Sequence, residues 1–101
     1  MSFIGWHTVQ VPGGLTPEVL KAAGDFILDF LKQHGATHAY LIQMSDDTYR
    51  VIEFWPDRAT HSKMLEAGRA WEEANGGRYY KAFGGESVAG QGGIGEVVAS
   101  R

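Results

Sequence analysis

The sequence predicts a single α+β domain in which two helices cover one face of a four-stranded antiparallel sheet. The length of 101 residues suits one domain. Short segments rich in β-branched and aromatic residues predict strands, and two longer segments with apolar residues every three to four positions predict helices. The order is strand, helix, strand, strand, helix, strand. Right-handed crossovers then place both helices on the same face, which is the ferredoxin-like βαββαβ sandwich.

The first half of the chain is predicted to form a strand, a helix and a second strand. Residues 3–11 are rich in aromatic and β-branched types and end at a Pro-Gly-Gly turn, so they predict the first strand. Thr16 and Pro17 suit the N-cap and the first helical position. The following apolar residues have helical spacing and predict a helix that ends near Gly35. Residues 38–44 then predict the second strand.

The second half repeats this order. The third strand, residues 49–55, stops at a proline, and Asp57 is placed to cap a helix that ends near Gly76. Tyr79 to Phe83 is expected to be the fourth strand. From Gly84 onward the chain is expected to be a loose tail, with residues 96–99 as a short segment that pairs with something. The domain is therefore assigned to residues 1–88 and the glycine-rich C-terminal tail to residues 89–101.

The hairpin between the second and third strands predicts which side chains share a face. With a four-residue turn at residues 45–48, Tyr40 lies opposite Glu53 and His38 lies opposite Trp55. All four side chains would then lie on one side of the sheet. A three-residue turn would shift the register by one position and reverse the faces.

A sheet with helices on one side leaves its other face bare. Both faces of the predicted sheet have too many apolar side chains to remain in water. We therefore expect a second copy of the chain to pack sheet against sheet, which makes a homodimer and closes an α+β barrel.

The composition disfavours several other partners and cofactors. A net charge of −3 argues against nucleic acid, whose binding depends largely on basic residues; RNA binding on the bare sheet is disfavoured further by Glu53 in the third strand. The absence of cysteine excludes thiolate nucleophiles and cysteine-ligated metals. No stretch approaches the roughly 18 apolar residues of a membrane span, and the N-terminus lacks a signal pattern. A cytoplasmic protein with no membrane partner is expected.

The sequence VIEFWPDRATHSKML, residues 51–65, resembles the strand-to-helix junction of the dimeric α+β barrel superfamily, especially its antibiotic biosynthesis monooxygenase-like branch. In that branch an aromatic residue, usually Trp, closes the third strand. The first-strand pattern SFIGWHTVQVPGG, the length and the element order extend the resemblance over residues 3–88. The resemblance implies a homodimer with pockets between sheet and helices, and Trp55 as a pocket wall.

Known activities in this superfamily differ. Its members oxidise aromatic polyketides without a cofactor, degrade haem or isomerise small lactones, and others have no known activity. The haem-degrading branch has an Asn on the first strand and a His on the second helix. Here the first-strand position is His7, and His61 comes earlier in the helix than that branch places its ligand. We therefore expect no haem-ligand role and no cofactor.

Glu53 and His7 are the candidate catalytic residues. A carboxylate on a central strand among apolar neighbours is partly desolvated, which raises its pKa and suits it to proton transfer near neutral pH. The alternative is a hydrogen bond or ion pair in a structural network. His7 could face the same cavity as an acid, a base or a substrate donor, and a hydrogen-bonded structural histidine is its alternative.

Trp55, Tyr40 and His38 are the candidate substrate-binding residues. For Trp55 the alternative is an ordinary core position at the strand end, and for His38 it is an exposed sheet edge. The four histidines and Glu53 match no familiar metal-binding spacing, so no metal is expected.

These observations leave two functions open. The first is a small-molecule-binding homodimer that acts as a cofactor-independent monooxygenase-like enzyme on an aromatic or other planar organic compound. The alternative is a non-catalytic dimeric binding or structural module with no turnover.

Overall fold

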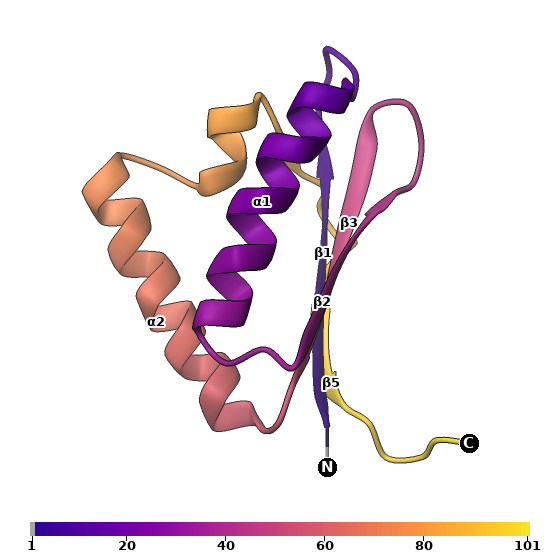
Figure 1. Cartoon of the computed structure of the whole chain (residues 1–101), viewed down its shortest axis with the longest axis vertical. Helices are drawn as coiled ribbons and strands as arrows, with labels where there is room; N and C mark the ends of the chain where they lie inside the picture. The colour runs from indigo at the N-terminus through magenta and orange to yellow at the C-terminus, as the bar shows by residue number, and fades with distance from the viewer. Residues whose placement is uncertain (1) are drawn as a thin grey trace.

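The computed structural model describes residues 2–101 and confirms the ferredoxin-like α+β fold. Both helices lie on the same side of the antiparallel sheet, which Figure 1 shows nearly edge-on. The strands follow the order β2-β3-β1-β4, with β5 also paired to β1, so β1 and β3 are central. The elements are β1 (Phe3–Gln10), α1 (Pro17–Gln33), β2 (His38–Gln43), β3 (Thr48–Trp55), α2 (Arg58–Asn75), the 3₁₀ helix η1 (Tyr79–Phe83), β4 (Glu86–Ser87) and β5 (Gly93–Glu96).

Both helices begin and end at the signals present in the sequence. The Thr16 hydroxyl accepts a hydrogen bond from the Val19 N–H at 3.1 Å, and the Asp57 carboxylate accepts one from the Thr60 N–H at 2.8 Å. The second helix ends where Gly76 adopts the left-handed conformation, with φ of 76°. Glycine tolerates this conformation because it has no Cβ.

The predicted fourth strand is wrong. Tyr79–Phe83 forms η1, because this compact turn lets Tyr79 and Phe83 pack against the same ring, Phe26 of α1; both ring centroids lie 6.3 Å from that of Phe26. In a strand, which rises about 3.3 Å per residue, the two residues would lie about 13 Å apart. The edge beside β1 is filled instead by two short strands in series. β4 pairs with Val9 and Gln10, and β5 pairs with residues 3–6.

β5 lies after the predicted domain boundary at residue 88 but belongs to the sheet. The interpretation of the chain from Gly84 onward as a loose tail is therefore wrong as far as Glu96, the last residue of β5. The glycine content of this segment concealed its strands, because glycine weakens the sequence signal for a strand.

The predicted register of the β2–β3 hairpin is wrong by one residue. His38 lies opposite Phe54, and Ala39 lies opposite Glu53. The cause is a shorter turn, in which the Met44 N–H and the Ser45 N–H both donate to the Thr48 carbonyl. A shift of one residue reverses the faces, so the side chains of β2 that were predicted to lie beside Glu53 point to the opposite side of the sheet.

The face of the sheet toward the helices, here called the inner face, forms the core of the domain. Its aligned residues in β1 and β3 are buried together with one stripe of α1. The largest fully buried side chains on this face are Phe3, Val9, Tyr49, Val51 and Trp55, and the α1 stripe consists of Ala23, Ile27 and Leu31.

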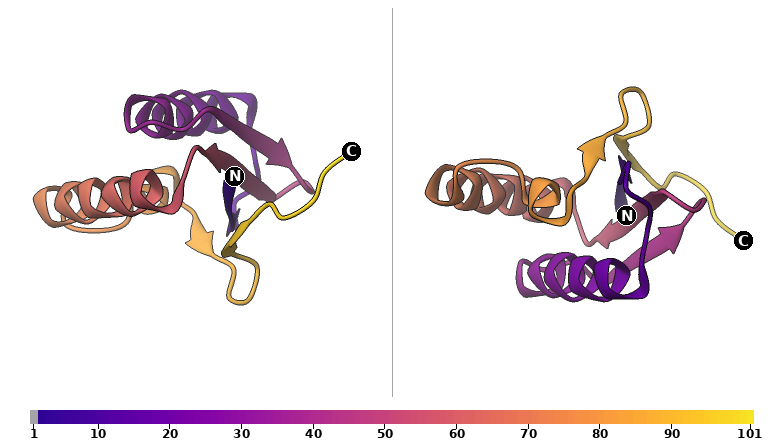
Figure 2. Two further views of the ribbon diagram at one scale, coloured as in Figure 1. Left: turned by 90° about the horizontal axis from the view of Figure 1, so that it is seen from below. Right: turned by 90° about the horizontal axis from the view of Figure 1, so that it is seen from above.

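The opposite face, here called the outer face, has no helix over it in the described part of the chain (Figure 2). Trp6 is 37% exposed, Tyr40 51% and Ile42 40%. These apolar and aromatic side chains come from β1 and β2 and lie on the same side as Ile52 and Phe54 of β3.

Among residues 2–101, no helix is both long enough and apolar enough to cross a membrane.

Candidate active site

A cavity of about 560 Å³ lies between the inner face, the two helices and η1. This volume falls within the roughly 300 to 1,000 Å³ of typical small-molecule sites. Apolar and aromatic side chains form most of the wall, chiefly Phe26, Ile27, Phe30, Met64 and Trp71. The polar side chains that line it include His7, Glu53, His61 and Tyr79, which come from β1, β3, α2 and η1.

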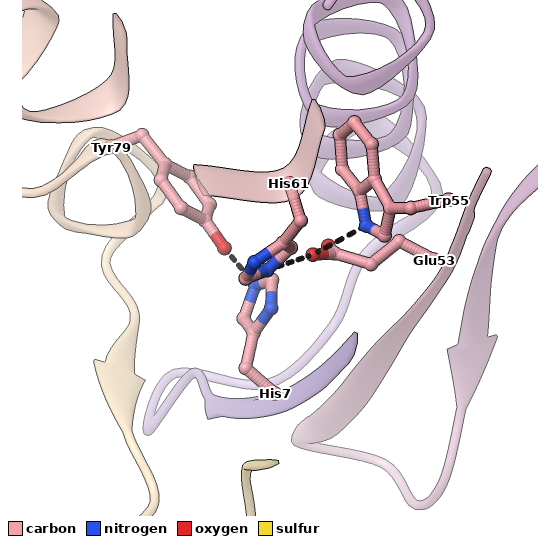
Figure 3. Close-up of polar contacts among 5 residues, drawn as sticks. All are labelled: His7, Glu53, Trp55, His61 and Tyr79. Atoms are coloured by element: carbon pink, nitrogen blue, oxygen red, sulfur yellow. Dashed lines mark hydrogen bonds and ion pairs between the residues drawn. The ribbon is translucent and has the colours of Figure 1, made fainter. Parts of the chain in front are cut away.

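Glu53 is the buried carboxylate of the cavity. It lies on the central strand β3 and is 4% exposed. The Trp55 Nε1–H donates a hydrogen bond to its Oε1 at 3.2 Å (Figure 3). Across the sheet it faces Gly5, where an added Cβ would lie 2.7 Å from the carboxylate oxygen. Glycine at this position therefore leaves the space that the carboxylate occupies.

The surroundings of Glu53 favour its protonated form. Burial raises the pKa of the Glu53 carboxyl to about 7, although the hydrogen bond from Trp55 acts in the opposite direction. At neutral pH the carboxyl is then divided between its two protonation states. A group with a pKa close to the working pH is suited to accept and return a proton.

His61 is the neighbour of Glu53 across the strand-to-helix junction. Its Nε2 lies 3.4 Å from the Glu53 Oε1, and the residue is 3% exposed (Figure 3). The rings of Phe3 and Trp55 hold it, with centroids 5.2 and 5.5 Å from that of His61. Burial, together with the charge of Arg58, lowers the pKa of the His61 ring. A neutral imidazole and a carboxyl group that exchanges its proton near neutrality thus form one buried pair.

His7 and Tyr79 form a second polar pair in the same cavity. The Nε2 of His7, on β1, is hydrogen-bonded to the hydroxyl of Tyr79 on η1 (Figure 3). Burial first, and the charge of Arg78 second, lower the pKa of His7 to about 4. Burial raises the pKa of the Tyr79 phenol, and the nearby Tyr49 and Glu53 add to this effect. Near neutral pH the ring is neutral and the phenol protonated, so the Tyr79 O–H donates to the His7 Nε2.

The structure brings both predicted catalytic residues, His7 and Glu53, to the same cavity. It places Trp55 differently from the prediction, because this residue is 1% exposed and lies behind Glu53 without lining the cavity. Its contribution to the site is the hydrogen bond that orients the carboxylate.

Tyr40 and His38 lie on the outer face, away from the cavity. Their rings stack against each other and meet the edge of Phe54, with centroids 6.2 and 6.4 Å from it. The predicted proximity to Glu53 and Trp55 depended on the hairpin register, which is shifted by one residue. Neither side chain can contact a ligand in this cavity.

Two cavity residues, His61 and Tyr79, were not among the predicted site residues. His61 precedes Met64 and Gly68 by three and seven positions, so helical periodicity places all three on one stripe of α2. That spacing was the signal for His61. Tyr79 had no comparable signal, because the segment was interpreted as a strand. Among residues 2–101, no group of three or more metal-ligating side chains is placed to hold a metal ion.

No family model and no curated protein matches the chain. The chain is similar in structure to SnoaB, a cofactor-independent oxygenase from Streptomyces nogalater, with a TM-score of 0.71 and 15% identity over 98% of this chain and 95% of that chain. It is also similar to a dimeric ferredoxin-like protein from an uncultured marine organism, with a TM-score of 0.57 and 13% identity over 99% and 98% of the two chains. These likenesses confirm the fold that the resemblance to the dimeric α+β barrel superfamily implied.

Proposed function

We propose that the protein is a homodimeric α+β barrel protein that binds a small molecule and acts as a cofactor-independent monooxygenase-like enzyme on an aromatic or other planar organic compound. The observation that supports this most is the carboxyl of Glu53, with its pKa near 7, at an apolar cavity of about 560 Å³. The structural likeness to a protein described as a cofactor-independent oxygenase points in the same direction.

The chemistry proposed for the site is proton removal. An oxygenase without a cofactor depends on its substrate to supply the electrons that reduce oxygen. Loss of a proton from a hydroxyl or an activated C–H raises the electron density of the substrate and makes this transfer easier. Glu53 is the proposed proton acceptor. The Trp55 N–H, 3.2 Å away, stabilises the ionised carboxylate, and His61 is close enough to exchange a proton with the protonated one.

The walls of the cavity support a planar ligand. Phe26 and Phe30 lie nearly parallel, with 12° between their ring planes, and Trp71 packs against Phe26 with centroids 5.2 Å apart. Aromatic side chains offer both flat faces and edges to a ring system. The Tyr79–His7 pair adds a hydrogen-bonding group that can orient an oxygen substituent of the ligand.

The test is turnover with a panel of hydroxylated and unsubstituted aromatic compounds, followed by oxygen consumption and by incorporation of isotopically labelled oxygen into the product. The Glu53→Gln variant is expected to lower kcat by about 100-fold or more, because it cannot accept a proton. The exposed Glu66→Gln change on α2 is the matched control and should leave kcat unaltered. Unchanged turnover in Glu53→Gln would contradict the assigned role of this residue.

The homodimer is part of the same proposal. The outer face exposes Trp6, Tyr40 and Ile42, and apolar patches of this kind favour contact with another protein surface. A second copy packed on this face would bury them. Size-exclusion chromatography with light scattering is expected to give twice the chain mass, and a stable monomer at micromolar concentration would contradict the dimer.

The second candidate function is a binding module without turnover. It is favoured by the fact that the polar groups of the cavity already have partners within the chain: Glu53 has Trp55 and His61, and His7 has Tyr79. Calorimetric binding of aromatic compounds with no oxygen consumption across the whole panel would support this candidate over the enzyme.

A further inference from the structure

The rim of the cavity has more positive than negative charge. Arg69 and Glu72 of α2 and Arg78, just before η1, line the cavity, and both arginines are exposed to solvent. The Arg78 Nε lies 2.6 Å from the Glu72 Oε1, so this arginine has one carboxylate partner. Within residues 2–101, Arg69 has no ion pair and no side-chain hydrogen bond. The rim therefore has two guanidinium groups and one carboxylate, which pairs with Arg78.

The positive charge of Arg78 at the rim affects the pKa values of two residues inside the cavity. Arg78 contributes, after burial, to the low pKa of His7, and it also favours the ionised form of Tyr79 against the larger effect of burial on that phenol. The chain as a whole has a net charge of −3, so this local excess of positive charge is opposite in sign to the protein average.

The inner end of the cavity, beside Glu53, disfavours a negatively charged ligand group. Glu53 is buried there and becomes negative when it loses its proton. A ligand anion beside it would meet a like charge in a region of low dielectric constant. An anionic group on the ligand therefore favours the rim, while an uncharged ring with a removable proton favours the Glu53 end.

We infer that the ligand is a planar aromatic molecule with an anionic substituent such as a carboxylate, held at the rim by Arg69 and Arg78 while its ring enters the cavity toward Glu53. This inference rests on the proposed function, because it concerns the same cavity. Arginine suits the task, since its planar guanidinium can donate two parallel hydrogen bonds to a carboxylate. Glu72 competes with the ligand for Arg78.

The test is isothermal titration calorimetry with two probes of nearly equal size and shape, naphthoate and its uncharged amide, naphthamide. The wild-type protein is expected to bind naphthoate about fivefold more tightly than naphthamide, the size expected for a partly exposed ion pair. Added salt should reduce this preference, because it screens exposed charges, and should leave naphthamide binding almost unaltered.

Three variants assign the preference to individual residues. Arg69→Gln and Arg78→Gln should each reduce the preference for naphthoate without weakening naphthamide binding. Glu72→Gln should increase it, because Arg78 is then free to pair with the probe. Lys63→Gln is the matched control, since Lys63 is an exposed cation on the same helix that does not line the cavity. This control is expected to keep the wild-type preference.

The outcomes separate the inference from the proposed function. Equal binding of both probes by the wild-type protein would overturn the inference and leave the ligand cavity in place. An equal loss of preference in Lys63→Gln would also overturn it, because the effect would then come from net charge. If neither probe binds, the proposed aromatic-binding cavity is itself contradicted, and the inference fails with it.

Discussion

The two faces of the sheet are built from alternate residues of the same strands, yet they differ in kind. On β3, Glu53 faces the helices and is 4% exposed, while its neighbours Ile52 and Phe54 face the uncovered side. The inner face is closed by helices, and Glu53 and His7 have polar partners there, as burial of a polar group requires, whereas the buried Tyr49 hydroxyl has no hydrogen-bond partner within residues 2–101. The outer face is open and exposes the large side chains of Trp6, Tyr40 and Ile42. The comparison separates the proposed small-molecule site from the proposed dimer surface.

The largest expected effect is the loss of Trp55, which fills the inner face. Trp55→Ala should lower the free energy of unfolding by about 3 to 5 kcal/mol, because the residue is fully buried and its removal leaves a cavity. Urea denaturation measures this loss. Trp6→Ala removes the same side chain from the outer face, where 37% of it is exposed, and should cost less at the same protein concentration. Equal losses would remove the distinction between the faces.

The next effect is the pH dependence that Glu53 imposes on stability. Its pKa is 4.5 ordinarily and about 7 in the folded protein. Below pH 4.5 the carboxyl is protonated in both states and has no effect on stability. Between the two values the unfolded chain ionises while the folded protein keeps its proton, so rising pH favours unfolding. The full penalty, about 3 kcal/mol, is present above the folded-state pKa.

Glu53→Gln removes this penalty. The free energy of unfolding of the variant minus that of the wild type is therefore expected to increase by about 3 kcal/mol between the ordinary and the folded-state pKa. Urea denaturation of both proteins over a series of pH values gives this difference, with the exposed Glu66→Gln change as the control that should stay flat. A flat difference for Glu53→Gln as well would show that Glu53 titrates normally.

The third effect concerns the outer face. Ile42→Asp places a charge on the proposed dimer surface and should weaken dimerisation by about 30-fold or more, the size expected for the loss of a central interface contact. Sedimentation equilibrium measures the dissociation constant. Leu65→Asp is the control, because Leu65 is also 40% exposed but lies on α2 beside the cavity. Dissociation by both variants to the same extent would argue against the sheet as the interface.

The smallest effect tests a single hydrogen bond on the inner side. Tyr79→Phe removes the donor to His7 and should lower the free energy of unfolding by about 1 kcal/mol. Tyr40→Phe on the outer face is the comparison, since its hydroxyl makes no hydrogen bond within residues 2–101 and it is 51% exposed. This control should be nearly neutral. A loss in Tyr40→Phe as large as that in Tyr79→Phe would contradict the contrast between the faces.

Part of the site was predictable because its signals are local. Glu53 stands among apolar and aromatic residues of a central strand, and alternation along that strand is sufficient to predict a buried carboxylate. His7 shares the inner face because the direct pairing of β1 with β3 brings alternate residues of both strands to the same side. His61 could have been found from its helical spacing to Met64. Tyr40 and His38 could not be placed, because one residue in the turn decides which face they occupy.

The sequence alone determined the order of the first five elements, the helix caps at Thr16 and Asp57, the left-handed helix end at Gly76 and the presence of a carboxylate in the core. Each of these depends on neighbouring residues or on one period of a helix or strand. Only the tertiary structure decided the hairpin register, the 3₁₀ helix at Tyr79 and the return of a glycine-rich segment to the edge of β1. The 3₁₀ helix and the edge strand depend on contacts between residues far apart in the chain, whose energies exceed the weak local preferences of a short segment. The register depends on a turn one residue shorter than the predicted one.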